Sequence, residues 1–220
     1  MRYAAGAEVL HDIDLTLKAG SFRFLVGPSG AGKTSLLRVI GLSVPISRGS
    51  ITLFGRDVAG LDPGQLARLR RRIGIVFQDF RLLDHLTAFD NVALPLRING
   101  VSEDAVSRLV SELLAWMGLE TLAPLPPPEL SIGERQLVAV ARAVITRPDL
   151  LLADEPLSNV DTQRAERLMY LFTELHRRGT AVLLATHSNE LLQRHRFPIL
   201  EMVAGRLRSG SLSSPLAAVD

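Results

Sequence analysis

A glycine-rich stretch near the start of the chain combines the residue types that bind phosphate. It reads GPSGAGKT from residue 27 to 34 and fits the pattern G-x-x-x-x-G-K-[ST]. Glycines let backbone N–H groups turn toward phosphate oxygens, and a helix that begins here adds the positive end of its dipole. Lys33 can reach the terminal phosphates, and the Thr34 hydroxyl can bind Mg²⁺. The expected nucleotide-binding residues of this stretch are Gly27, Pro28, Ser29, Gly30, Ala31, Gly32, Lys33 and Thr34.

Two carboxylates follow a second apolar run. Residues 150–153 are apolar, and Asp154 and Glu155 follow them directly. A carboxylate at a strand end can hold Mg²⁺, and its neighbour can polarise an attacking water. Taken alone, an Asp-Glu pair after a strand is more often a turn or a helix cap. Together with a phosphate loop, the pair predicts hydrolysis, with Asp154 on the metal and Glu155 as the catalytic group.

Gln78 and His187 also follow apolar runs. A single polar residue at a strand end is usually a structural hydrogen-bonding group. Here, however, the runs at 21–26, 72–77, 150–153 and 181–186 are separated by helical stretches. That arrangement indicates a parallel sheet buried on both faces, and such sheets bind ligands beyond the carboxyl ends of their strands. The four strand ends are therefore expected to meet at one crevice.

The remaining segments predict smaller elements around this sheet. Residues 48–58 alternate between apolar and polar and are flanked by glycines, which indicates an antiparallel hairpin. Residues 101–119 and 133–145 have apolar residues at helical spacing, so a helical insert is expected at about 80–147. Four prolines between residues 124 and 128 are expected to form an extended connector. The tail at 209–220 is expected to be poorly ordered.

Composition limits the classes of protein that this chain can represent. Its 220 residues, with 47% hydrophobic and 22% charged residues, suit one globular domain. The absence of cysteine excludes a disulfide framework and a thiolate metal site. A formal charge of only +2 argues against a general nucleic-acid surface. No apolar run approaches the roughly 20 residues needed to span a bilayer, so any membrane association is expected to come through a partner.

Six motifs in this order resemble those of the ATP-binding cassette (ABC) ATPases. GPSGAGKT is similar to Walker A, Gln78 to the Q-loop, and LSIGE at residues 130–134 to the signature motif. LLLADEP is similar to Walker B, SNVD at residues 158–161 to the D-loop, and His187 to the switch histidine. The resemblance implies an α/β P-loop NTPase (RecA-like) fold. Its mainly parallel sheet core would carry a small antiparallel β subdomain and an inserted helical subdomain, forming a single domain over residues 1–208.

The resemblance also implies how the site works. ATP and Mg²⁺ would be bound, with Thr34, Gln78 and Asp154 at the metal. Glu155, His187 and Gln78 would act in catalysis, and Tyr3 lies where the family places an aromatic on adenine. Two copies would form a head-to-tail homodimer. Ser131 and Gly133 of one copy would then donate hydrogen bonds to the γ-phosphate bound by the other.

Within this family, residues 70–98 and the EPLSNVD stretch are similar to the FtsE group of bacterial cell-division ATP-binding proteins. That likeness implies an integral membrane partner of the FtsX type, binding near residues 78–98, and a role in controlling cell-wall hydrolysis. The location would be the cytoplasmic face of the inner (plasma) membrane. A subunit of a lipoprotein-releasing or macrolide-type exporter is the alternative with the same chemistry.

Several positions depart from the family pattern. Ile132 stands where the signature usually has glycine, and a β-branched residue adds bulk where backbone approaches phosphate. Leu157 and Ser158 occupy D-loop positions where Thr and Gly are usual, and Ser188 replaces the common acidic residue after the histidine. These changes predict weakened closure and slow turnover. They leave open a second class of function, an ATP-binding scaffold with little hydrolysis.

Overall fold

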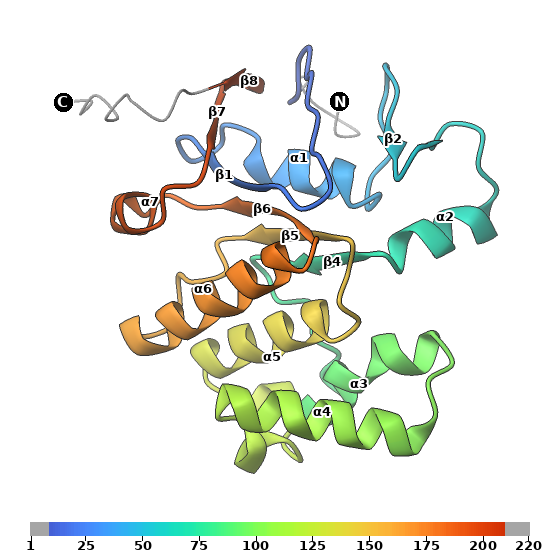
Figure 1. Cartoon of the computed structure of the whole chain (residues 1–220), viewed down its shortest axis with the longest axis vertical. Helices are drawn as coiled ribbons and strands as arrows, with labels where there is room; N and C mark the ends of the chain where they lie inside the picture. The colour runs from blue at the N-terminus through green and yellow to red at the C-terminus, as the bar shows by residue number, and fades with distance from the viewer. Residues whose placement is uncertain (1–8, 210–220) are drawn as a thin grey trace.

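A parallel sheet runs through the centre of the computed structural model, which describes residues 9–209 (Figure 1). Within these residues the sheet has six strands in the order β4-β5-β6-β1-β7-β8. They are β1 (Phe22–Val26), β4 (Ile73–Val76), β5 (Leu150–Asp154), β6 (Ala181–Ala185), β7 (Ile199–Val203) and β8 (Arg206–Ser209). All neighbours pair in parallel except β7 and β8, which form an antiparallel hairpin. The four predicted strands are confirmed, whereas β7 and β8 were not predicted.

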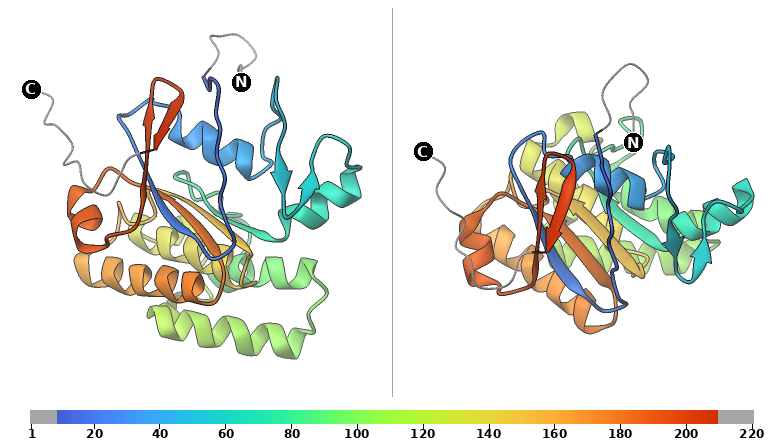
Figure 2. Two further views of the ribbon diagram at one scale, coloured as in Figure 1. Left: turned by 45° about the horizontal axis from the view of Figure 1, so that its top comes forward. Right: turned by 90° about the horizontal axis from the view of Figure 1, so that it is seen from above.

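Helices cover both faces of this sheet. Helix α1 (Lys33–Ile40) lies on one face, and α5 (Ile132–Val144) and α6 (Thr162–Arg177) lie on the other, as Figure 2 shows. Successive residues of a strand point to opposite faces, so Phe24 belongs to the core under α5 and α6, while Leu25 belongs to the core under α1. Both side chains are fully buried. This double burial explains why the strand segments are mainly apolar, with Arg23 in β1 as an exception.

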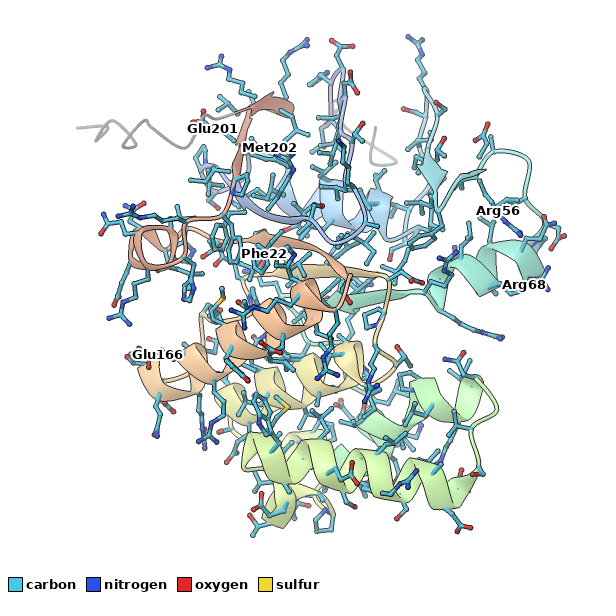
Figure 3. All side chains as sticks on the ribbon, viewed as in Figure 1. Phe22, Arg56, Arg68, Glu166, Glu201 and Met202 are labelled. Carbon is cyan, nitrogen blue, oxygen red and sulfur yellow. The ribbon has the colours of Figure 1, made fainter. Side chains whose placement is uncertain are left out.

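A two-stranded antiparallel sheet lies beside the main sheet. It is formed by β2 (Thr52–Leu53) and β3 (Arg56–Asp57), joined through Phe54 and Gly55, which both have positive φ. Two central residues with positive φ are typical of a tight hairpin turn. The predicted hairpin is confirmed, although its strands are short. Helix α2 (Pro63–Arg70) follows, and Figure 3 shows Arg56 and Arg68 on this side of the molecule.

Helices α3 (Ala88–Ile98), α4 (Glu103–Met117) and α5 lie between β4 and β5 in the sequence, inside the range expected for the helical insert. Helix α3 packs against both α4 and α5, and α5 also packs against β4. Short 3₁₀ turns, η1 (Glu120–Leu122) and η2 (Pro127–Glu129), connect α4 to α5. The expectation of an extended proline connector was wrong for Pro127 and Pro128, because proline also suits the first turn of a helix.

Two further boundaries differ from expectation. Helix α7 (Asn189–Arg194) leads into the β7–β8 hairpin, and β8 continues to Ser209, one residue beyond the expected end of the domain at 208. Tyr3 and residues 210–220 lie outside the described residues, so the predictions made for them stay predictions. Among residues 9–209, no helix is long and apolar enough to cross a membrane.

Candidate active site

The glycine-rich loop connects β1 to α1 and has a backbone that only glycine readily adopts. Gly27, Gly30 and Gly32 have φ angles of 149°, 77° and 105°. A Cβ on Gly27 would also collide with the carbonyl group of Met202, a β7 residue labelled in Figure 3. Gly32 caps α1 without a side-chain hydrogen bond. The loop therefore brings N–H groups and the helix dipole together, as an anion site requires.

Lys33 is the first residue of α1, and its side chain points back over this loop. Nζ donates hydrogen bonds to the carbonyl oxygens of Gly27, at 2.6 Å, and Pro28, at 3.2 Å. Side chains on a helix lean toward its N-terminus, which explains this direction. The ammonium group therefore lies over the mouth of the loop, where it adds positive charge.

The next residue, Thr34, contacts the end of β5. Its hydroxyl donates a 2.6 Å hydrogen bond to Oδ2 of Asp154, although the two residues are 120 positions apart. Asp154 is only 5% exposed. Burial raises the pKa of its carboxyl above the usual value, the Thr34 hydrogen bond acts in the opposite direction, Glu155 raises it further, and Lys33 lowers it. Lys33 and Glu155 therefore both act electrostatically on the carboxyl of Asp154.

The Thr34 hydroxyl and the Asp154 carboxylate suit Mg²⁺, which prefers oxygen ligands. Within the described residues there is no group of three or more His, Cys, Asp or Glu side chains that could hold a metal ion. Mg²⁺ bound to a nucleotide takes one or two protein groups and fills its remaining positions with phosphate oxygens and water. The donor set therefore fits magnesium bound together with a nucleotide.

Glu155 has an unusual backbone conformation and a direct side-chain partner. Its φ is 49°, and its N–H donates to the carbonyl oxygen of Ala185 on the neighbouring strand β6. Its Oε1 lies 2.8 Å from Nδ1 of His187. The carboxylate is largely enclosed, with 14% of the side chain exposed, whereas the imidazole is 75% exposed. A left-handed conformation costs energy in a residue other than glycine, and such residues concentrate at functional sites.

Gln78 lies two residues beyond β4, next to β5 in the sheet. It is exposed, and among residues 9–209 it makes no hydrogen bond with Thr34 or Asp154. Its place at the carboxyl edge is as predicted, and its assignment to the metal stays a prediction.

Ser131 and Gly133 begin helix α5. Ser131 is the N-cap: it accepts from the Glu134 N–H, and its own hydroxyl donates to the Glu134 carboxylate at 2.7 Å. The Ser131 hydroxyl and the Ser131 backbone N–H both donate to the Glu134 carboxylate and hold its pKa below the usual value. In the described chain neither Ser131 nor Gly133 hydrogen-bonds to residues 27–34. Among the described residues of one chain, these two residues of the signature motif are therefore not hydrogen-bonded to the phosphate loop.

Gly133 has a packing role that the motif did not predict. A Cβ at this position would lie 2.6 Å from the carbonyl oxygen of Asn159, in the loop between Glu155 and α6. Ser158 in the same loop donates to the backbone oxygen of Glu155 at 3.0 Å. Ile132, in contrast, is 53% exposed. The signature helix and the loop that follows Glu155 are thus in backbone contact within one chain.

Three residues of this region were missed by the sequence reasoning: Asn91, Arg142 and Asn159. Asn91 is fully buried, and Arg142 interrupts the apolar run of α5. A polar or charged residue on the inner face of an apolar helix is a readable signal, because burial requires that it find partners. Asn159 carries no such signal, since its contribution is a backbone oxygen.

Comparison with known proteins identifies the family. A family model described as "ABC transporter" matches residues 10–158, more than half of the chain. The chain belongs to the ABC transporter family. It is an ABC-type ATPase, a protein that binds and hydrolyses ATP.

Curated relatives of this ABC ATPase cover nearly its whole length. The cell division ATP-binding protein FtsE of Escherichia coli K12 is 42% identical over 209 residues, 94% of each chain. FtsE of Mycobacterium tuberculosis is 41% identical over 198 residues, covering 90% of this chain and 86% of the relative. FtsE of Bacillus subtilis is 37% identical over 190 residues, with coverage of 86% and 83%.

Solved structures agree with this family and fold. Two dimeric structures of the ATP-binding cassette MJ0796 have TM-scores of 0.89 at 32% identity, covering 96% of this ABC ATPase and 95% of the solved chain. One of them is described as a post-hydrolysis state bound to ADP and Pi. The predicted P-loop NTPase fold, with its mainly parallel core, is therefore confirmed.

Proposed function

We propose that this ABC ATPase is the FtsE-like subunit of a membrane complex that controls cell-wall hydrolysis during division. The names of the relatives support the assignment to division, since those at 37% to 42% identity are all cell division proteins. The observation that carries the chemistry is the 2.6 Å hydrogen bond between Thr34 and Asp154 beside the phosphate loop. It joins the two oxygen donors that a magnesium nucleotide needs.

In this proposal the phosphate loop holds the triphosphate of ATP, and Lys33 moves from its own loop carbonyls to the terminal phosphates. Thr34 and Asp154 hold Mg²⁺, with Gln78 approaching from the end of β4. When bound, the ion neutralises charge on the phosphate oxygens. Asp154 is already oriented by the Thr34 hydroxyl, so little rearrangement is needed at these two residues.

Glu155 is the proposed catalytic group. Its carboxylate would accept a hydrogen bond from the attacking water, and His187 would hold that carboxylate through the 2.8 Å contact and face the γ-phosphate. Because Glu155 is enclosed and His187 is exposed, the imidazole is the member of the pair that can reach a bound phosphate from outside.

The proposed active form is a head-to-tail homodimer. Ser131 and Gly133 do not reach the phosphate loop of their own chain, and the two similar solved structures are described as dimeric. In such a dimer each signature motif would close the nucleotide site of the other copy. Closure would exclude water from the site before hydrolysis.

The proposed membrane partner is of the FtsX type and binds near residues 78–98. Two large apolar side chains in this stretch are exposed, Leu83 at 36% and Ile98 at 53%. Such side chains suit a groove that receives a short amphipathic helix. This contact would place the ABC ATPase at the cytoplasmic face of the inner membrane.

A phosphate-release assay tests the proposed chemistry. The full chain is mixed with Mg-ATP and its partner, and Glu155→Gln is expected to reduce kcat by about 100-fold or more. The matched control is Glu166→Gln, because Glu166 lies on α6 in an exposed ion pair with Arg194 (Figure 3). Equal rates in the Glu155→Gln variant and the wild type would refute the role of Glu155.

Co-purification tests the proposed partner. An FtsX-type membrane subunit is expected to bind the wild-type chain, and Leu83→Asp is expected to weaken that binding because it places a charge in the apolar contact. Binding instead to the membrane subunit of a lipoprotein-releasing or macrolide-type exporter would favour that alternative. A Glu155→Gln chain that dimerises with Mg-ATP and still supports division would favour the other alternative, an ATP-binding scaffold with little hydrolysis.

A further inference from the structure

Arg142 joins helix α5 to the segment that follows Gln78. Its Nη2 donates to the carbonyl oxygen of Phe80 and its Nη1 to that of Arg81, both at 2.7 Å. The planar guanidinium therefore binds the backbone of two consecutive residues at once. Such forked geometry is specific to arginine, since lysine offers a single ammonium group.

The two residues held in this way have a strained backbone. Phe80 and Arg81 have φ angles of 56° and 50°. Bulky residues rarely occupy this left-handed region, and they persist there only where the surroundings hold them. The two hydrogen bonds from Arg142 stabilise the conformation in which both carbonyl groups face α5.

Two further side chains hold the same segment to the helical region. Arg135 lies two turns before Arg142 on the same face of α5, with its guanidinium 5.9 Å from the centre of the Phe80 ring. Asn91, on α3, accepts from the Leu83 N–H and donates to the carbonyl oxygens of Leu83, Leu86 and Thr87. Among the described residues, the side-chain hydrogen bonds that reach residues 79–86 from other elements come from Asn91 and Arg142.

The Arg142 guanidinium binds these carbonyl groups and forms no ion pair with the residues that the structure describes. Burial lowers the pKa of its guanidinium to about 10, and no carboxylate in the described chain offsets that effect. Arg142 therefore stays charged at neutral pH. Because no carboxylate pairs with this buried cation, the two carbonyl dipoles stabilise its charge. Hydrogen bonds from a charged donor are strong.

We propose that Arg142 is a positioning residue that makes Gln78 and residues 79–86 follow the movement of α5. This inference rests on the proposed function, because it concerns how the same ATPase site is assembled. Helix α5 begins at the signature residues Ser131 and Gly133, whereas Gln78 continues from β4 in the sheet. When the nucleotide of a second copy displaces the start of α5, Arg142 would pull Phe80 and Arg81 with it and so reposition Gln78 toward Asp154.

The test uses the full chain with Arg142→Gln, Arg142→Lys and a matched control, Arg177→Gln. Arg177 lies on α6 in one exposed ion pair with Glu174. Hydrogen–deuterium exchange without nucleotide is expected to become about tenfold faster in residues 78–87 of Arg142→Gln. Exchange in β1 and β5 should stay at the wild-type rate, because Arg142 makes its hydrogen bonds to residues 80, 81 and 91 and to neither strand. The control should match the wild type everywhere.

Kinetics with Mg-ATP provides the second measurement. Arg142→Gln is expected to lower kcat about tenfold and to change KM less than twofold, since the phosphate loop is intact. In a Gln78→Ala background, Arg142→Gln should lower kcat no further, because both changes remove the same contribution. A merely structural arginine would instead lower kcat by the same factor in both backgrounds, and that result would overturn the proposal.

Arg142→Lys keeps the charge and much of the aliphatic stem but lacks the planar fork that donates to two carbonyl groups in parallel. It is expected to give about a threefold effect in exchange and in kcat, and it decides the question if Arg142→Gln does not fold. Wild-type exchange at residues 78–87 in the lysine variant would overturn the proposal. The exchange measurement does not depend on hydrolysis, so failure of the proposed function, seen as equal phosphate release by wild type and Glu155→Gln, is distinguishable from failure of this inference.

Discussion

Oε1 of Glu155 lies 2.8 Å from Nδ1 of His187, across the ends of two neighbouring parallel strands. Glu155 follows β5 directly, and His187 comes two residues after β6. The N–H of Glu155 is also bonded to the last residue of β6. The pair is therefore fixed by the sheet, and its geometry depends on the register of β5 against β6 and not on a mobile loop.

His187→Ala removes the side-chain partner of Glu155 and leaves the carboxylate free to turn. We expect kcat for phosphate release to fall at least tenfold and ATP binding to weaken less, because His187 makes no hydrogen bond with residues 27–34 of the phosphate loop. His195→Ala, at the end of α7, is the control and should behave as the wild type. A His187→Ala chain with wild-type kcat would show that the contact is not needed.

Asp154→Asn is expected to stabilise the chain while it reduces hydrolysis. Burial raises the pKa of Asp154. A carboxyl with a higher pKa in the folded state favours folding most below its unfolded-state pKa, about 3.9, and this contribution is lost as pH rises through the folded-state pKa. Asparagine removes the buried charge but keeps an oxygen for Thr34. Without nucleotide or Mg²⁺, we expect the free energy of unfolding at pH 7 to rise by about 1 kcal/mol.

The pH dependence of that gain is the diagnostic measurement. Denaturant unfolding of Asp154→Asn and the wild type should give converging stabilities as pH falls from 7 toward about 4, because the pKa of Asp154 is raised and protonation removes its buried charge. Asp149→Asn is the control, because Asp149 is half exposed in its pair with Arg72. A gain of the same size at both pH values would contradict burial of the charge as the cause.

Gly133→Ala should destabilise the chain although alanine is the better helix former. The added Cβ would lie 2.6 Å from the Asn159 carbonyl oxygen, and a backbone group cannot move aside cheaply. We expect the free energy of unfolding to fall by about 1 kcal/mol or more. Gly64→Ala is a matched control at the same position of α2, where the added Cβ meets only the Asp62 side chain, at 3.2 Å. Its stability should not fall.

Ile132→Gly tests the proposed effect of Ile132 on dimer closure separately from the packing role of Gly133. The Ile132 side chain is about half exposed, so its removal costs little packing within one chain. We expect turnover by the dimer to accelerate while the free energy of unfolding changes by about 1 kcal/mol or less. Steady-state phosphate release measures the first effect. Unchanged turnover would remove our explanation of this departure from the family pattern.

Asn91→Ala removes a fully buried side chain that makes three hydrogen bonds to residues 79–86 and a fourth to Thr87, the N-cap of its own helix. The N–H of Leu83 and several carbonyl groups would lose their partner inside the protein. We expect a loss of about 2–3 kcal/mol in the free energy of unfolding. Asn99→Ala, at the exposed end of α3, should change it by about 0.5 kcal/mol or less. Similar changes in the free energy of unfolding for the two variants would show that the hydrogen bonds of Asn91 do not stabilise this segment.

The parts of the fold that the sequence predicted are those with a local pattern. Continuous apolar runs identified β1, β4, β5 and β6, because a strand buried on both faces has apolar side chains on both. Strand β7 was missed because its buried residues alternate with partly exposed ones and do not form a continuous apolar run. The turn at η2 was missed because prolines suit both extended chain and the first helical turn.

The sequence by itself determined the chemistry available to this ABC ATPase: glycines for a phosphate loop, a lysine, a hydroxyl and two carboxylates. Tertiary structure decided which of these groups meet. Thr34 reaches Asp154, Glu155 pairs with His187, Gly133 lies against Asn159, and Arg142 holds Phe80 and Arg81. Local sequence encodes backbone conformation and side-chain type, whereas contacts between residues far apart in the chain depend on strand order, register and packing, which no single segment contains.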